Sequence, residues 1–213
     1  MQALPTIQQA GQIDTTPLLQ LRQWLWYNNR ALRLRETCRI ISQEYGGVVP
    51  SDPVDLMNLP GIGCYTAHAV SSFAYNLPHP VLDTNIKRVW FHHYPETVNM
   101  KESDLITFAS QFIPEGESRV WHTALMDYGA VELKMSKSNI RINPKQSTFR
   151  WSTRWVRSHI IKHVLKFWSS DLDNLFAQYA VPWEYSRVQF DEIISKMVID
   201  GLIVINNWFI IIN

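Results

Sequence analysis

The sequence predicts a mainly helical domain over residues 1–143, followed by a small α+β domain over residues 144–213. Three observations support this prediction. Apolar residues recur at helical spacing over most of the stretch from residue 18 to residue 131. A short glycine-flanked turn, Leu59-Pro60-Gly61-Ile62-Gly63, interrupts that pattern. After Asp200-Gly201, two apolar β-branched runs flank a pair of asparagines, a pattern typical of a β-hairpin.

Length and composition limit the possible classes of protein. A chain of 213 residues that is 46% hydrophobic can bury a real core, and no apolar run reaches membrane-spanning length. The N-terminus shows no secretory signal, so we expect a cytoplasmic protein. The net charge of +1 neither requires nor excludes nucleic acid, because a local basic patch decides such binding. Two cysteines, Cys38 and Cys64, are too few for a four-cysteine metal or iron–sulfur site.

The first helices have recognisable starts. Thr15-Thr16-Pro17 predicts a helix start with proline just inside it, and the helical pattern continues from Leu18 to Glu44, where Gly46-Gly47 ends it. Asp52 or Ser51 is expected to cap a short helix that has Pro53 at its first position. Further amphipathic helices are expected over residues 101–113 and 121–131.

The glycine-flanked turn has a physical interpretation of its own. Gly61 and Gly63 lack a Cβ, so the backbone there can take a positive φ and another group can approach it closely. The helix that follows begins with unpaired N–H groups at the positive end of its dipole. Such a helix start binds anions, and a nucleic-acid phosphate is the anion that we expect here. The alternative is an ordinary tight turn between two helices.

Two motifs together carry a resemblance to a known family. The turn is followed by Tyr65-Thr66-Ala67, and about twenty residues later by Val81-Leu82-Asp83-Thr84-Asn85-Ile86-Lys87-Arg88-Val89. In both of these motifs, the chain resembles the helix-hairpin-helix DNA glycosylases. Within them it looks most like the MutY-type adenine glycosylases, with endonuclease III a more distant relative. The resemblance extends from about Leu18 to Pro144 and includes Ala124-Leu125-Met126-Asp127-Tyr128-Gly129-Ala130.

The resemblance implies a fold, a reaction and a partner. The expected fold is a helix-hairpin-helix glycosylase domain. The expected function is that of a monofunctional base-excision-repair DNA glycosylase that removes adenine mispaired with 8-oxoguanine or guanine. The alternatives are a thymine/uracil mismatch glycosylase and a DNA-binding paralog that has lost catalysis. The expected partner is double-stranded DNA with a mismatched or damaged base, bound by a monomer that does not associate with a membrane.

The resemblance also assigns roles to individual residues. Asp83 is the expected catalytic carboxylate, which stabilises or attacks an oxocarbenium-like sugar, and its position also suits a helix N-cap. Asn85 is expected to orient this carboxylate or to contact the backbone. Tyr65 stands where bifunctional relatives carry a lysine, so no Schiff base is expected there. The expected DNA-binding residues are Leu59, Gly61, Ile62, Gly63, Tyr27, Asn28, Arg30 and Asn85.

The sequence departs from the family pattern near its N-terminus. Tyr27 to Leu34 fits the stretch that inserts side chains into the DNA stack, but Trp24 and Trp26 replace two glycines, so we expect the tight turn to be lost. The family's adenine-protonating glutamate lies in a helix before this stretch, and no glutamate precedes Leu18. The chain is therefore expected to be N-terminally short. A misread start, a fragment and a degenerate paralog all remain open as explanations.

No cofactor is expected. The positions aligned with the family's cluster ligands are Leu133, Ile140, Asn143 and a site near Phe149, and none is a cysteine. His159 and His163 have a metal-ligand spacing on a predicted helix but no third ligand nearby. We therefore interpret this histidine pair as part of a solvated helix face and expect no metal.

The C-terminal part predicts a winged helix. Helices are expected over residues 155–167, 172–179 and 185–200, followed by a hairpin that turns at Asn206-Asn207. The first of these helices has a basic side, made by Arg150, Arg154, Arg157, Lys162 and Lys166. An auxiliary DNA clamp and a small packing module are both consistent with this pattern.

Overall fold

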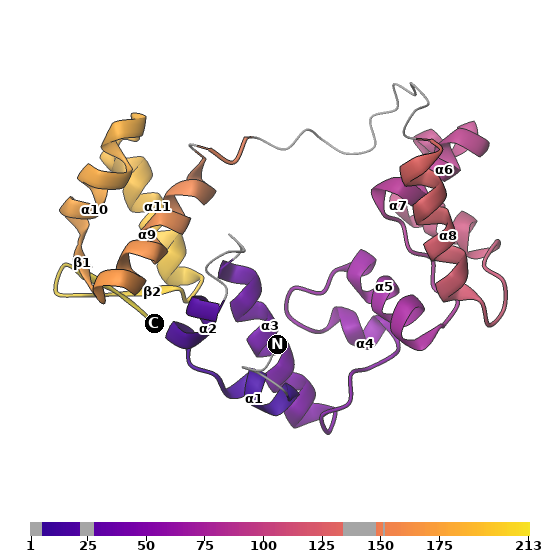
Figure 1. The fold of residues 1–213 in the computed structure, drawn as a ribbon, viewed down its shortest axis with the longest axis horizontal. Helices are drawn as coiled ribbons and strands as arrows, with labels where there is room; N and C mark the ends of the chain where they lie inside the picture. Colours follow the sequence, from indigo (N-terminus) through magenta and orange to yellow (C-terminus); the bar gives the residue numbers. More distant parts are fainter. Residues whose placement is uncertain (1–5, 22–27, 134–147, 151) are drawn as a thin grey trace. The chain divides into compact units, whose positions relative to one another are not determined.

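The computed structural model describes residues 6–21, 28–133, 148–150 and 152–213. It is mainly helical with one small sheet, as predicted (Figure 1). The chain forms two compact units, one made of residues 49–145 and the other of residues 1–48 together with 146–213. No helix in the described part of the chain is both long and apolar enough to cross a membrane.

In its described part, the unit of residues 49–145 contains helices and connecting loops but no strand. Its elements are α4 (Pro53–Met57), α5 (Cys64–Tyr75), α6 (Thr84–His93), the 3-10 helix η1 (Pro95–Asn99), α7 (Glu102–Ser110) and α8 (Ser118–Val131). Their core includes Val81, Leu82, Ile86, Trp90, Leu105 and Ala109. Trp90 of α6 meets Phe108 edge to face, with the ring centroids 5.7 Å apart. These contacts hold α6 against α7.

The cap predicted for α4 is confirmed. Asp52 is the N-cap, its carboxylate accepts a hydrogen bond from the backbone N–H of Val54 at 2.7 Å, and Pro53 is the first helical residue. The side chain of Leu56 is only 2% exposed and anchors this short helix. The turn that follows is therefore attached to the core at its N-terminal side.

The other unit combines the N-terminal helices with a winged helix. The N-terminal elements are α1 (Ile7–Gln12), α2 (Thr15–Leu21) and α3 (Asn28–Glu44). The C-terminal elements are α9 (Thr153–Phe167), β1 (Ser170–Asp171), α10 (Leu172–Tyr179), the 3-10 helix η2 (Val181–Trp183), α11 (Arg187–Ile199), β2 (Ile203–Asn206) and β3 (Phe209–Ile212). The strands form an antiparallel sheet in the order β1-β3-β2. The predicted winged helix is thus present, with a two-residue strand β1 that is too short for the sequence pattern to reveal.

The N-terminal helices share their core with the winged helix. Leu19 of α2 is 1% exposed and belongs to the apolar cluster formed mainly by α9, α10 and α11. Asn29 of α3 donates to Asp200 at 2.8 Å and accepts from Arg157 at 3.0 Å, and Arg157 pairs with Asp200. Burial would raise the pKa of Asp200, but the hydrogen bonds from Asn29 and Arg157 and the charge of Arg157 together lower it. This grouping differs from the predicted division, which assigned all of residues 1–143 to one domain.

The β2–β3 turn lies one residue later than predicted. Asn206 pairs with Phe209, so the two turn residues are Asn207 and Trp208, with φ of 47° and 74°. Two-residue hairpin turns of this kind need positive φ at both positions. The register pairs Ile205 with Ile210, which is fully buried, and a one-residue slip would turn Ile210 to solvent. Burial of the isoleucine face therefore outweighs the poor fit of a tryptophan to positive φ.

The two histidines of α9 do not form a solvated face. His159 lies against Trp155 with ring centroids 3.8 Å apart, and Nδ1 of His163 is 3.0 Å from the hydroxyl of Tyr179. Burial, with a contribution from the charge of Lys166, lowers the pKa of His163. Both rings therefore pack among aromatic side chains, which corrects the interpretation made from their spacing.

Candidate functional site

The turn before α5 has an open backbone. Gly61 has a φ of +82°, and the N–H of Ile62 donates to the carbonyl of Leu59 at 3.1 Å, which closes the turn. Leu59 is 3% exposed and fixes the turn to the core. Gly63, in contrast, is extended at φ −95°, so only Gly61 needs the left-handed conformation that we expected to be accessible to both.

Gly63 matters for space and not for conformation. A Cβ built on Gly63 would meet no atom within 4 Å, and Gly63 is the N-cap of α5 without a side-chain cap. The first N–H groups of this twelve-residue helix therefore begin at an exposed surface without a capping side chain. The geometry suits the close approach of an anion from solvent.

Asp83 begins the second helix of the site. Its Oδ1 accepts a hydrogen bond from the backbone N–H of Ile86 at 2.7 Å, so Asp83 is the N-cap of α6. An open pocket of about 400 Å³ is lined by Tyr65, Leu82, Asp83, Thr84 and Lys87. The structure thus brings the two predicted catalytic residues, Tyr65 and Asp83, to one pocket. The capping role of Asp83 occupies Oδ1 and leaves Oδ2 with a long contact, 3.4 Å, to the amide of Asn85.

Tyr65 is a neutral hydrogen-bonding group at this pocket. Its side chain is 47% exposed. Partial burial, and then the negative charge of Asp83, raise the pKa of its hydroxyl, which therefore keeps its proton. Lys87, which the sequence interpretation overlooked, directs Nζ to a carboxylate oxygen of Glu102 at 2.9 Å. Lys87 follows Asp83 by four residues, and this i,i+4 spacing was the signal that could have revealed it.

Arg88 connects the start of α6 to α8. Its guanidinium donates to the side-chain oxygen of Asn85 at 3.0 Å and to the carbonyl of Gly129 at 2.5 Å. The amide of Asn85 therefore directs its NH2 group toward Asp83 and its oxygen toward Arg88. A Cβ on Gly129 would lie 2.2 Å from the backbone oxygen of Asn85, so α8 can approach this closely only with glycine at that position. The side chain of Asn85 thus lies between Asp83 and Arg88, and its role in orienting the carboxylate stays a prediction.

The remaining predicted DNA-binding residues belong to the other compact unit. Tyr27, like Trp24 and Trp26, lies outside the described residues, and Asn28 begins α3. Arg30 is exposed on α3.

Of the aligned cluster positions, Leu133 is 5% exposed, while Ile140 and Asn143 lie outside the described residues. Within the described ranges, no group of three or more His, Cys, Asp or Glu side chains is arranged to hold a metal ion. The expectation that no cofactor is bound thus rests on the residue types at the aligned positions.

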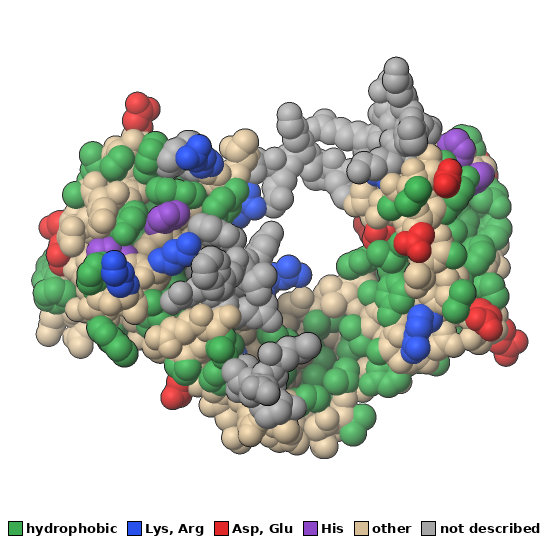
Figure 2. Space-filling view, viewed as in Figure 1, with side chains coloured by type: hydrophobic (Ala, Val, Ile, Leu, Met, Phe, Trp, Pro, Cys, Tyr) green, Lys and Arg blue, Asp and Glu red, His purple; other side chains and the backbone are tan. Residues whose placement is uncertain are grey.

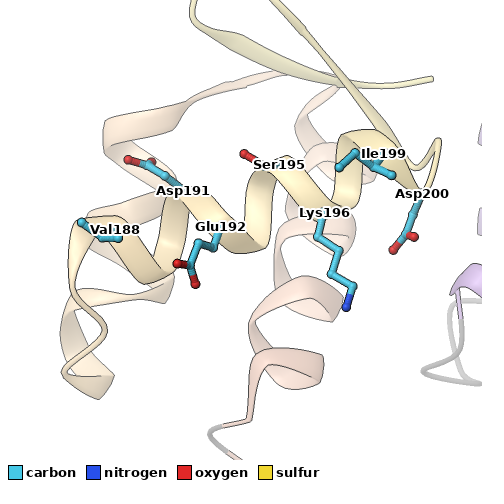
Figure 3. A pocket seen from close by; sticks show the side chains of 7 residues that line it. All are labelled: Val188, Asp191, Glu192, Ser195, Lys196, Ile199 and Asp200. Carbon is cyan, nitrogen blue, oxygen red and sulfur yellow. The ribbon is translucent and has the colours of Figure 1, made fainter.

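The winged helix offers two surfaces of different character. In a winged helix that binds DNA through its third helix, α11 would enter a groove. Its exposed face forms an open pocket of about 610 Å³ lined by Val188, Asp191, Glu192, Ser195, Lys196, Ile199 and Asp200 (Figure 3). Three carboxylates and two apolar side chains suit a phosphate backbone poorly.

Helix α9 is basic, but its charges are engaged or dispersed. Arg157 is paired with Asp200, Arg154 lies over the ring of Phe149 at 5.9 Å, and Lys166 lies over the ring of Phe167 at 5.0 Å. On the face of the winged-helix unit seen in Figure 2, Lys and Arg side chains stand separately among apolar and polar ones. If this unit contacts DNA, α9 is a better candidate than α11.

Known proteins resemble this chain in sequence and in fold. It is 33% identical over 207 residues to the adenine DNA glycosylase of Mycolicibacterium smegmatis, across 88% of this chain and 70% of that protein. It is 34% identical over 107 residues to a thymine/uracil-DNA glycosylase of Methanothermobacter thermautotrophicus, across 49% of this chain and 48% of that protein. No protein-family model matches the chain.

Among solved structures, endonuclease III in a non-covalent complex with DNA is similar, with a TM-score of 0.54 and 25% identity. The superposition covers 63% of this chain and 64% of that one. The mainly helical architecture is therefore the helix-hairpin-helix glycosylase fold, which confirms the fold expected from the two motifs.

Proposed function

The chain belongs to the family of adenine DNA glycosylases, and on that premise we propose that it binds double-stranded DNA and excises a mispaired base. The reaction is hydrolysis of the bond between base and sugar, in which water adds to the sugar carbon and the base departs with a proton. The preferred substrate is adenine opposite 8-oxoguanine or guanine. The observation that carries this proposal is the pocket that Asp83 and Tyr65 share beside the uncapped start of α5.

The turn and the start of α5 hold the DNA backbone. The N–H groups after Gly63 donate to phosphate oxygens, which fixes the position of the duplex without reading its sequence. Because Gly63 has no neighbour within 4 Å of a Cβ position, a phosphate can reach these groups unhindered.

The carboxylate of Asp83 acts on the sugar. A base cannot be cut while it is stacked in the duplex, so the target nucleotide turns out of the helix and its glycosidic bond enters the pocket. As that bond breaks, positive charge develops on the sugar ring, and the carboxylate stabilises it electrostatically. Asn85, held by Arg88, orients the carboxylate for this role.

The product is an abasic site in an intact strand. Tyr65 offers a hydroxyl and no amine, so it cannot form a Schiff base with the sugar aldehyde. Nζ of Lys87 is engaged in an ion pair with Glu102. Strand cleavage by elimination is therefore not part of the proposed activity.

A second candidate function is DNA binding without excision. It is favoured by the composition of the pocket: the described residues that line it include Asp83, Tyr65 and Lys87, and none of them offers a second carboxyl group that could protonate a departing adenine. A thymine or uracil mismatch glycosylase is the third possibility, supported by the relative of that name.

An excision assay separates these functions. Labelled duplexes containing adenine opposite 8-oxoguanine, adenine opposite guanine, thymine opposite guanine or uracil opposite guanine are incubated with the chain and then treated with alkali. We expect alkali-dependent cleavage at adenine opposite 8-oxoguanine and no cleavage before alkali. Binding to all four duplexes without excision of any base would establish the binding function instead, and cleavage only at thymine or uracil would establish the third.

A further inference from the structure

Two histidines form hydrogen bonds to the peptide group between Pro80 and Val81, shortly before Asp83. The carbonyl of Pro80 accepts a hydrogen bond from Nδ1 of His68 at 2.9 Å, and the N–H of Val81 donates to Nε2 of His122 at 3.1 Å. These two backbone atoms belong to the same peptide unit. His68 of α5 binds its carbonyl and His122 of α8 accepts from its N–H, so two helices hold the chain two residues before the candidate catalytic carboxylate.

The hydrogen bonds determine which nitrogen of His122 carries the proton. A backbone N–H can only donate, so Nε2 must be unprotonated to accept from Val81. Nδ1 must then carry the proton, and it lies 2.8 Å from the carbonyl of Ser118, which can only accept. The hydroxyl of Ser72 lies 3.0 Å from the same nitrogen and 2.8 Å from the hydroxyl of Ser118. The imidazole is therefore neutral, with both nitrogens satisfied.

From this geometry we propose that His122 is a positioning residue for base excision, which holds the Asp83 segment in place only while its ring is neutral. A proton added to Nε2 would point at the N–H of Val81, so that two donors would face each other in a buried site. His122 is 2% exposed and cannot turn to water without opening the core. The proposal rests on the proposed glycosylase function, because it concerns the geometry of that site.

A change in the contact between His122 and Val81 can reach Asp83 because the segment between them is short and buried. Val81 is fully buried and Leu82 is 6% exposed, so both side chains are held in the core of the unit. Asp83 follows at once and begins α6. A shift of about 1 Å at a catalytic group is enough to cost up to about a hundredfold in rate.

The two histidines respond differently to acid. His68 donates through Nδ1, and protonation of its other nitrogen leaves that donor in place. His122 accepts through Nε2 and loses this contact when protonated. Among the described residues, the other titratable groups near these two histidines include Cys64, whose sulfur lies 3.9 Å from Nε2 of His68, and His79, which contacts the ring of His68. The charge of Asp52 acts on His79, and Tyr65 and Asp83 lie at the pocket. Of these two hydrogen bonds to the peptide group, acidification therefore removes only the one from Val81 to His122.

The effect on stability has a definite sign. Burial lowers the pKa of His122, against a smaller opposing effect of its hydrogen bond to Ser118. The folded protein thus binds this proton less tightly than the unfolded chain does. The stability contributed by neutral His122 is present above the unfolded pKa, about 6.5, and is lost as the pH falls from there through the lowered folded value.

Two substitutions test the proposal. In His122→Gln the amide oxygen can reach the place of Nε2 and accept from Val81, but it does not titrate. In His122→Asn the amide reaches only the place of Nδ1, so the contact with Ser118 is kept and that with Val81 is lost. The surface histidine His92, at the end of α6, provides a control, His92→Gln.

Single-turnover excision and duplex affinity are measured from pH 7.5 to pH 5.5, with folding checked by circular dichroism at each pH. We expect the parent and His92→Gln to lose rate as the pH falls below about 6.5, by no more than about tenfold at pH 5.5 because the folded pKa of His122 is lowered, with a smaller change in affinity. His122→Gln should keep most of the rate that the parent shows at neutral pH, and it should not show the decrease in rate that protonation of His122 causes in the parent. His122→Asn should be slow at every pH.

A second measurement does not require activity. In a 15N-labelled sample, the amide signal of Ile86, which bonds to the Asp83 carboxylate, should shift with the titration of His122 in the parent and should not do so in His122→Gln. An Ile86 signal that ignores the protonation of His122, or an acid loss unchanged in His122→Gln, would overturn the proposal. If no duplex is cut but the Ile86 signal follows the titration of His122, then His122 does hold the Asp83 segment, and it is the proposed excision function that is wrong.

Discussion

The starts of α5 and α6 form the two halves of the candidate site, and their surroundings are opposite in kind. The start of α5 carries Gly63, which has no side-chain cap and no atom within 4 Å of a Cβ position. The start of α6 carries Asp83, whose side chain caps the helix and whose neighbours are packed so closely that a Cβ on Gly129 would lie 2.2 Å from Asn85. One half is open to a ligand, and the other is fixed by the protein itself.

This difference indicates how the two halves divide the work. A phosphate site needs unoccupied donors and room for the backbone of another molecule. A catalytic carboxylate must stay in one place while charge develops on the substrate, so contacts from Asn85 and the neighbouring helix are useful to it. Substitutions at the start of α5 should therefore change DNA affinity, and substitutions at the start of α6 should change the rate of excision or the stability of the fold.

The largest expected effect is on the chemistry. Asp83→Asn keeps the shape and the capping oxygen but removes the charge. We expect excision of adenine opposite 8-oxoguanine to fall by at least about 10²- to 10³-fold, while duplex affinity and the urea midpoint stay near those of the parent. Asp83→Ala should lose the same activity and in addition about 0.5–2 kcal/mol of stability, because it also removes the cap. Excision by Asp83→Asn at the parent rate would show that Asp83 only caps α6.

The next effect is on folding. Gly129→Ala places a methyl group 2.2 Å from the backbone oxygen of Asn85, and backbone at that point cannot move aside cheaply. We expect a loss of about 1–3 kcal/mol in the free energy of unfolding, measured by urea denaturation. Gly63→Ala is the matched control, because its added methyl meets no neighbour and its φ of −95° suits alanine, so its only expected cost is the lower preference for alanine than for glycine at an N-cap. Equal destabilisation by both substitutions would contradict the contrast between the two helix starts.

A smaller effect is expected on DNA binding. Gly63→Val adds a branched side chain where the phosphate is proposed to approach, without clashing with the protein. Affinity should fall by about tenfold, the value of one charged hydrogen bond, and by the same factor for matched and mismatched duplexes. Fluorescence anisotropy at several salt concentrations measures this. Unchanged affinity would mean that the open turn is only a connection between α4 and α5.

The smallest effect concerns the winged helix, where two surfaces also differ: α9 is basic, and the exposed face of α11 carries carboxylates. Lys166→Gln on α9 should weaken duplex binding by about twofold to threefold and reduce the slope of affinity against salt by about one. Lys196→Gln on α11, whose exposed face also carries Asp191 and Glu192, should change neither. An effect of Lys196→Gln alone would assign DNA contact to α11. Point substitutions suit this test better than truncation after residue 143, because Leu19 is buried in the winged-helix core.

The sequence by itself determined the parts of this protein that depend on local chemistry. The caps at Asp52 and Asp83, the turn from Leu59 to Gly63 and the hairpin near the C-terminus are short-range features, because each rests on residue types within a few positions of one another. Family motifs added the helix-hairpin-helix fold. The same motifs singled out Tyr65 and Asp83, and the structure shows that these two residues line one pocket.

Only the tertiary structure decided the features that join distant segments. The grip of His122 on Val81, the contact of Arg88 with Gly129 and the burial of Leu19 in the winged-helix core link residues that lie far apart in the sequence. Their side chains carry no local signature, since a histidine on a helix can equally face solvent. The turn at Asn207-Trp208 has the same explanation, because burial of Ile210 sets the register and overrides the asparagine signal.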